Sequence, residues 1–291
     1  MERNGPAMTS RTSNVAGAAS LALATCCAPV SAQDTSPLHA TAPIVLPNSL
    51  TCAQNSPNPP EAKRSEKERS VSYGVEVEFS SGDADRGVLI SDRAVVQAVT
   101  WVSGSVAAFS VWSNVTLGET TDGSRPQILD MELTRVHKWR NLTIEPAIRA
   151  FFYRDPLSIY SSRSIEGRLY LSYHVGPFRL FANQSVDVLT YQGAYFGEAG
   201  IAFERRVSRR IAVGGSSNTG WASSTFNDAY VGIDTSALNL TGMEGWLTVY
   251  VKPHFYVGPH FQFTTTVDRT VRTALARPTL VFVGLTTGVE F

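Results

Sequence analysis

The stretch Leu142-Thr-Ile-Glu-Pro-Ala-Ile-Arg-Ala-Phe-Phe152 alternates between two kinds of side chain. Leu142 and Ile148 fall on one face of an extended chain, whereas Glu145 and Arg149 fall on the other. A helical spacing would instead mix charged and apolar side chains on a single face. The stretch therefore predicts a β-strand that has one apolar and one polar face.

The same period of two recurs throughout residues 70–291, where about twelve such runs can be counted. Short and long connections alternate between the runs, as they do in barrels that cross a bacterial outer membrane. No run after residue 35 reaches the roughly 18 consecutive apolar residues of a membrane helix. The mean hydropathy of -0.05 is compatible with a membrane barrel, whose lumen-facing residues are polar. The sequence therefore predicts an all-β fold, an antiparallel transmembrane β-barrel of about 12 strands.

The first 32 residues predict a signal peptide that is cleaved after Ala32. Met8-Thr-Ser-Arg11 supplies a basic start, residues 15–25 are small and apolar, and Val30-Ser31-Ala32 fits the small-x-small cleavage rule. A lipoprotein signal ending at Cys26 is the weaker alternative, because the residue before it is a threonine. We therefore expect export of the mature chain.

Residues 33–69 are rich in proline and end in a charged run, so they predict a disordered periplasmic linker. The alternative is that this segment docks to a partner or to the cell wall. All three cysteines lie before residue 53, which leaves no disulfide framework for residues 70–291.

The final strand places Val281, Val283, Leu285 and the terminal Phe291 on one face. An apolar, alternating strand that ends in an aromatic residue resembles the signal that the outer-membrane barrel assembly machinery reads. We therefore expect Phe291 to act as an assembly signal, with that machinery and the outer-membrane lipid as partners.

A family resemblance covers residues 70–291. Arg86-Gly87, the strand that begins Val95-Val-Gln97, Val111-Trp-Ser-Asn-Val115 and Leu129-Asp-Met-Glu-Leu133 resemble, in that order, the TorF-like group of porins from Gram-negative bacteria. The resemblance implies a diffusion pore in the outer membrane.

The inward face of the expected barrel is mainly acidic. Its expected ionisable residues are Glu76, Glu78, Asp130, Glu132, Glu145, Glu166, Asp187, Glu198, Glu204 and Glu244, against Arg149, Arg168 and Arg179. Its expected aromatic residues are Phe151, Tyr170, Phe181, Phe196, Trp246 and Tyr250, which would narrow the bore. This pattern predicts a narrow, acid-biased lumen that passes ions or small polar solutes. The alternative is a structural or adaptor barrel with a closed lumen, which would act through its loops or its linker.

Other function classes lack support in the sequence. The formal net charge of +0 gives no electrostatic footprint for nucleic acid. No histidine is expected in the outer half of the barrel, where a rim hydrolase would need its general base. No spacing of metal ligands and no cofactor fingerprint stands out. We therefore expect neither an enzyme nor a metal or cofactor site.

Overall fold

The computed structural model describes residues 71–121, 123–154 and 163–291. The expected signal peptide (1–32), the expected linker (33–69) and residue 70 lie outside the described residues. The main strands are β1 (Val71–Ser80), β4 (Val95–Gly104), β5 (Ala107–Thr116), β6 (Gln127–Arg135), β8 (Leu142–Arg154), β9 (Arg163–Val175), β10 (Phe178–Asp187), β11 (Tyr195–Arg206), β12 (Ile211–Ala222), β13 (Ala237–Lys252), β14 (Phe255–Thr266) and β15 (Thr279–Glu290).

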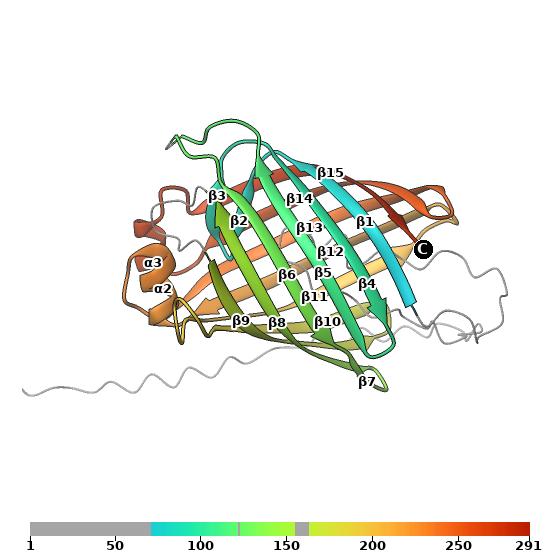
Figure 1. The fold of residues 1–291 in the computed structure, drawn as a ribbon, viewed down its shortest axis with the longest axis horizontal. Helices are drawn as coiled ribbons and strands as arrows, with labels where there is room; N and C mark the ends of the chain where they lie inside the picture. Colours follow the sequence, from blue (N-terminus) through green and yellow to red (C-terminus); the bar gives the residue numbers. More distant parts are fainter. Residues whose placement is uncertain (1–70, 122, 155–162) are drawn as a thin grey trace, which may run out of the picture. The chain divides into compact units, whose positions relative to one another are not determined.

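These strands form a closed antiparallel barrel of 12 strands (Figure 1), which confirms the expected fold class. Each strand pairs with the next main strand along the chain, β1 pairs with β15, and the pairing of β6 with β8 completes the ring. The short strand β7 (His137–Trp139) follows β6 and continues its pairing with β8. A closed ring leaves no unpaired edge strand.

A two-residue turn at Arg140-Asn141 sets the register between β6 and β8. Trp139 pairs with Leu142, and the same register places Glu132 opposite Arg149. Because side chains alternate with a period of two, this register also fixes which residues face inward.

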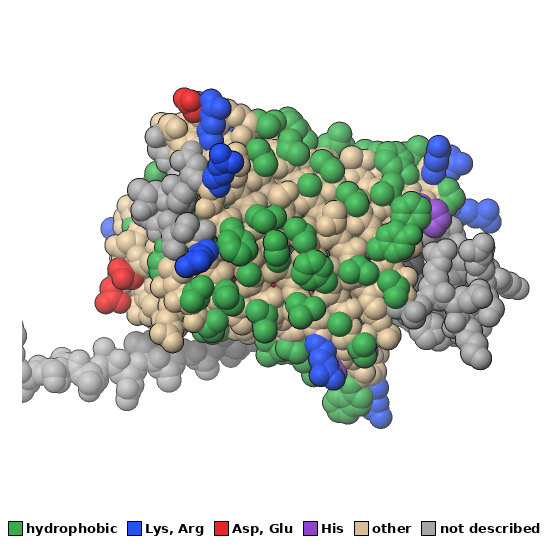
Figure 2. All heavy atoms as spheres, in the orientation of Figure 1, with side chains coloured by type: hydrophobic (Ala, Val, Ile, Leu, Met, Phe, Trp, Pro, Cys, Tyr) green, Lys and Arg blue, Asp and Glu red, His purple; other side chains and the backbone are tan. Residues whose placement is uncertain are grey.

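The exterior of the barrel is apolar and the interior is polar. Along β1 the outward residues Tyr73 and Phe79 are 55% and 52% exposed, whereas the inward Glu76 and Glu78 are 1% and 2% exposed. Figure 2 shows hydrophobic side chains spread over the strands, with lysines and arginines near the two ends of the barrel. The alternation seen in the sequence therefore separates a water-avoiding outer surface from a charged interior.

The two ends of the barrel differ in their connections. At the short-turn end, pairs of neighbouring strands are joined by connections such as 105–106, 140–141 and 176–177. At the long-loop end lie the longer connections, which hold α2 (Ser224–Val231), α3 (Arg269–Ala274) and a hairpin of β2 (Asp83–Asp85) and β3 (Val88–Ser91). The sequence predicts the alternation of lengths but not these elements.

Local capping explains both helices. Ser223 accepts a hydrogen bond from the backbone N–H of Phe226, and Gly232 ends α2 in the left-handed region at φ 80°. Asp268 accepts from the N–H groups of Thr270 and Val271 at the start of α3. Over the described ranges, neither helix is long and apolar enough to cross a membrane.

Candidate functional site

The barrel interior brings together the ionisable residues that the sequence assigns to the lumen. Of the thirteen ionisable residues that are expected to face inward, the structure buries eleven and leaves Glu204 and Glu244 half-buried. The eleven are Glu76, Glu78, Asp130, Glu132, Glu145, Arg149, Glu166, Arg168, Arg179, Asp187 and Glu198. Their burial agrees with the strand parity that the sequence predicts, and their role as a pore lining stays a prediction.

One group of these residues forms a chain of ion pairs on β6, β8 and β9, which we call the paired wall (Asp130, Glu132, Arg149, Glu166 and Arg168). Arg149 donates from Nε to Asp130, and its Nη1 lies 3.9 Å from Glu166 Oε2. Arg168 donates to Glu132. Because each carboxylate has an arginine nearby, the desolvation of these charges is offset locally.

A second group lies on β1 and β14, which we call the acidic wall (Glu76, Glu78, Tyr256 and His260). Tyr256 donates its hydroxyl hydrogen to Glu76, and His260 Nε2 lies 3.2 Å from Glu78 Oε1. No arginine forms an ion pair with Glu76 or Glu78 among the residues that the structure describes. The acids of this wall are held by a hydroxyl and an imidazole instead.

Glycines in β15 make room for the two rings of the acidic wall. A side chain at Gly284 would overlap the His260 ring, and one at Gly288 would overlap the Tyr256 ring. The rings from β14 therefore lie against the backbone of β15. This arrangement requires residues without a Cβ at these two positions.

Two other predicted residues have individual environments. Asp187 accepts hydrogen bonds from the backbone N–H groups of Leu189 and Tyr191, so it orders the connection after β10. Glu198 accepts from the side-chain amides of Asn183 and Asn218 at 3.1 and 2.8 Å.

Glu145 is 0% exposed, and neither of its carboxylate oxygens has a hydrogen bond within the described part of the chain. The positive charges of Arg179 and Lys138 act on it. Glu145 is therefore a buried acid that has both positive charges and the negative charge of Glu132 near it.

The hairpin β2–β3 adds a site residue that the sequence analysis misses. Arg86, at the tip of the hairpin, donates from Nη1 and Nη2 to the two carboxylate oxygens of Glu166 at 2.7 and 2.5 Å. The Arg86 guanidinium also lies 5.5 Å from the ring centre of Phe196 and 5.6 Å from that of Phe226. The hairpin therefore enters the barrel and reaches the paired wall.

Apolar side chains surround this hairpin and join opposite parts of the barrel. Val88 and Ile90 of β3 belong to one buried cluster with residues of β4, β5 and β6 and with residues of β11, β13 and α2. The other members include Val99, Trp112, Ile128, Phe196, Leu240, Phe226 and Tyr230. Because this cluster includes residues from opposite sides of the barrel, it fills the lumen at the level of the hairpin.

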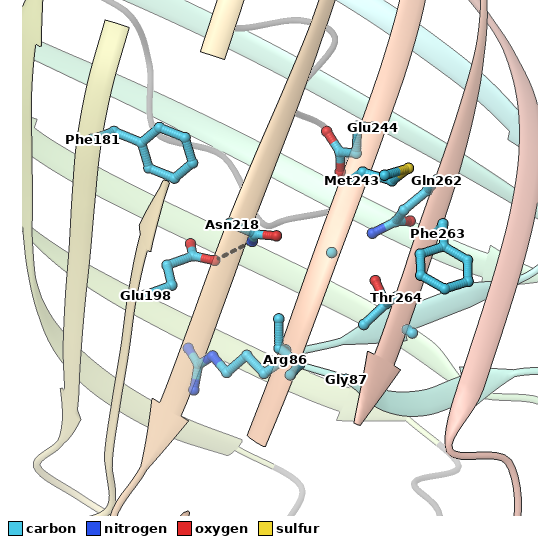
Figure 3. Close-up of a pocket in the computed structure, with 13 residues that line it drawn as sticks. Arg86, Gly87, Phe181, Glu198, Asn218, Met243, Glu244, Gln262, Phe263 and Thr264 are labelled. Carbon is cyan, nitrogen blue, oxygen red and sulfur yellow. Dashed lines mark hydrogen bonds between the residues drawn. The ribbon is translucent and has the colours of Figure 1, made fainter. Parts of the chain in front are cut away.

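A small polar cavity remains between the hairpin tip and the strands β10 to β14 (Figure 3). Its volume is about 40 Å³, and its lining includes Arg86, Glu198, Asn218, Glu244 and Gln262. A water molecule needs roughly 10–15 Å³ by this measure, so the cavity has room for a few waters. Beside the hairpin the free space in the interior is therefore small, and polar and apolar side chains both line it.

The interior holds further ionisable groups that the count of inward residues omits. Arg206 is half-buried at the end of β11, and its guanidinium lies 5.2 Å from the centre of the Tyr250 ring. Asp83 of β2 is 4% exposed and accepts from the Asn114 side-chain amide. The parity of β11 could have indicated Arg206, because Glu204 has the same parity. Arg86 and Asp83 carry no such signal, since they lie in a connection.

The described ranges contain no group of three or more His, Cys, Asp or Glu side chains placed to hold a metal ion.

No protein-family model matches the sequence, and no curated protein matches it. Solved barrels of low sequence identity are similar in structure. The NanC porin has 12% identity and a TM-score of 0.48 over 75% of this chain and 98% of its own. The KdgM porin has 8% identity and a TM-score of 0.44 over 76% and 98%. An outer membrane channel from Pseudomonas putida F1 has 10% identity and a TM-score of 0.47 over 79% and 100%. The TorF-like resemblance is not confirmed by these comparisons.

Proposed function

We propose that this chain is an outer-membrane channel for the passive diffusion of ions and small polar solutes. The observation that carries the proposal is the barrel itself, a closed ring of 12 strands with an apolar exterior and a charged interior. An exterior of this kind is stable in lipid, where a closed barrel satisfies its backbone hydrogen bonds without an exposed edge.

Aromatic side chains near the short-turn end support a membrane position. Tyr73, Trp139, Tyr173, Phe178 and Phe291 are each at least 43% exposed, and all lie close to strand ends at that end of the barrel. Aromatic girdles occupy the lipid–water boundary in outer-membrane barrels. Because outer-membrane barrels have short turns on the periplasmic side, the short-turn end would face the periplasm.

The route to the membrane is part of the proposal. The predicted signal peptide would direct export and would be cleaved after Ala32, and the assembly machinery would then insert the barrel. Mass spectrometry of protein purified from outer membranes tests this route. A mature chain that begins at Gln33 is the expected result, and an uncleaved chain in the cytoplasm would contradict it.

A second candidate function is a structural barrel with a closed lumen. The hairpin β2–β3 and the apolar cluster around it favour this candidate, because they fill the lumen at one level. The cavity beside the hairpin holds only a few waters, so the channel of the first candidate would be narrow.

Recording in planar lipid bilayers distinguishes the two candidates. The purified barrel should first show a shift between boiled and unboiled samples on a gel, which reports a folded barrel. Folded protein that gives discrete conductance steps supports the channel. Folded protein that gives no steps, even after deletion of residues 83–91, would leave the structural barrel as the function.

A further inference from the structure

The hairpin β2–β3 is a separate unit inside the barrel. Its two strands pair only with each other among the described residues, and they contain three and four residues. The turn residues Arg86 and Gly87 have φ values of 52° and 84°, as a tight type I′ turn requires. An isolated hairpin of this size is marginally stable in water, so its position depends on what it docks against.

The docking contacts lie on both sides of the lumen. At the root, Asp83 is bound to Asn114 of β5, and Ala84 and Leu89 pack with Leu280 and Phe282 of β15. At the tip, Arg86 is bound to Glu166 of β9. The hairpin thus crosses the interior from the seam between β1 and β15 to the paired wall.

Undocking would break no strand pairing of the barrel, because the hairpin forms its own two-stranded sheet. The wall also holds a second cation for Glu166. Arg149 Nη1 lies 3.9 Å from Glu166 Oε2, so the carboxylate keeps an arginine beside it when Arg86 leaves. Removal of a buried charge is costly chiefly when the partner remains uncompensated. Here the Arg86–Glu166 contact can open without leaving Glu166 alone.

We propose that the hairpin is a gate, and that the bidentate contact between Arg86 and Glu166 is the latch that holds it across the lumen. This inference rests on the proposed channel function. In the closed state the hairpin and its apolar cluster fill the barrel. In the open state Arg86 moves into water at the long-loop end, and the lumen between the walls becomes continuous.

A latch variant gives the first test. Arg86→Gln should raise the open probability of single channels in planar bilayers roughly tenfold, because the charged hydrogen bonds are lost. Arg93→Gln is the matched control, since Arg93 lies in the same connection, is exposed and donates to the Glu119 carbonyl outside the lumen. An unchanged open probability for folded Arg86→Gln would overturn the latch.

A reversible crosslink gives the second test, independent of the latch residues. A Cβ at Gly87 would lie 3.4 Å from Leu240 Cβ, close to the roughly 3.5–4.5 Å of bridged cysteines. The variant Gly87→Cys with Leu240→Cys, with Cys26, Cys27 and Cys52 changed to serine, should be closed when oxidised and should conduct after reduction. The oxidised and reduced states belong to the same variant. Any strain from a cysteine side chain at Gly87, whose φ of 84° lies in the left-handed region, is therefore present in both states.

The outcomes separate the two proposals. Equal conductance in the oxidised and reduced states means that the channel stands and the gate is wrong. Absence of conductance in both states and in a barrel that lacks residues 83–91 means that the channel itself is wrong. Conductance that appears only on reduction supports both.

Discussion

The paired wall and the acidic wall differ in the side chains that contact their buried carboxylates. Both bury carboxylates inside the barrel, yet the paired wall sets Arg149 and Arg168 against its acids, whereas the acidic wall holds Glu76 and Glu78 with a tyrosine and a histidine. Carboxylates that are paired with arginines largely cancel those charges at a distance, whereas no arginine pairs with the acids of the acidic wall among the described residues. The paired wall is therefore suited to hold the hairpin, and we propose that the acidic wall attracts cations.

The position of each wall follows from the topology. The paired wall uses the consecutive strands β6, β8 and β9, which short and long connections join in order along the chain. The acidic wall lies at the seam where β1 meets β15, so its stability depends on the contact between the first and last strands. Changes to the paired wall should consequently affect mainly stability, whereas changes to the acidic wall should affect assembly and selectivity.

The largest effect is expected when the paired wall loses its central cation. Arg149→Met leaves Asp130 without its ion-pair partner and removes one of the two arginines beside Glu166. Breaking a buried pair in this way should lower the free energy of unfolding by about 3–5 kcal/mol. Urea unfolding of the barrel in phospholipid micelles measures the change. Arg125→Met is the control, because its pair with Glu119 is 59% and 64% exposed and should contribute less than about 1 kcal/mol.

The acidic wall should be most sensitive to changes where β1 pairs with β15. Phe291 exchanges backbone hydrogen bonds of 2.9 and 3.1 Å with Tyr73, and its ring stacks on those of Tyr73 and His254. Deletion of Phe291 removes all these contacts and the expected assembly signal, so the amount of folded barrel in outer membranes should fall several-fold. Phe291→Ala keeps the backbone bonds and should have a smaller effect. Equal membrane levels of wild-type and truncated protein would contradict both roles.

The fold and much of the site follow from local sequence rules. A two-residue turn at Arg140-Asn141 and a period of two are enough to place Glu132 opposite Arg149 and to assign both inward. The hairpin does not follow from such rules, because its strands are short and its position depends on a contact between Arg86 and Glu166, 80 residues apart. The connection between β4 and β5 lies at 105–106, since Ser103 still pairs with Ala108. Helices α2 and α3 have only short capping signals at Ser223 and Asp268.

The root of the hairpin should make the gate sensitive to pH. Burial first, and then the nearby carboxylates of Asp85 and Glu78, raise the pKa of Asp83 to about 7, although a hydrogen bond with Gln97 lowers this pKa in part. An undocked Asp83 would have an ordinary pKa near 3.9. The docked state therefore binds more protons between these values, so it is favoured as pH falls and disfavoured as pH rises towards 7.

The expected result is a rise in open probability from about pH 5 to about pH 7.5, with a slope of at most about tenfold per pH unit for one proton. Single-channel recording over this range gives the measurement. Asp83→Asn cannot ionise and should flatten the profile while it keeps a polar contact with Asn114. A profile that is equally steep in Asp83→Asn would assign the pH dependence to another group.

The smallest expected effect concerns the charge difference between the walls, and it compares two double variants of buried residues. Glu76→Gln with Glu78→Gln removes the two ionisable carboxyl groups from the acidic wall. Glu132→Gln with Arg168→Gln removes one charge of each sign from the paired wall.

A unit charge acts on an ion about 8 Å away with about 0.5 kcal/mol in a water-like medium, which is about twofold in partitioning. The first variant should therefore lower the cation preference by at most about fourfold, and the second should change it by less than twofold because the net charge is constant. Reversal potentials under a salt gradient at pH 7.5, measured in wild type or in Arg86→Gln, give the ratio. Equal changes in the two variants would show that the walls do not differ in the field that a passing ion meets, and an anion preference in the unmodified channel would contradict the acid bias of the lumen itself.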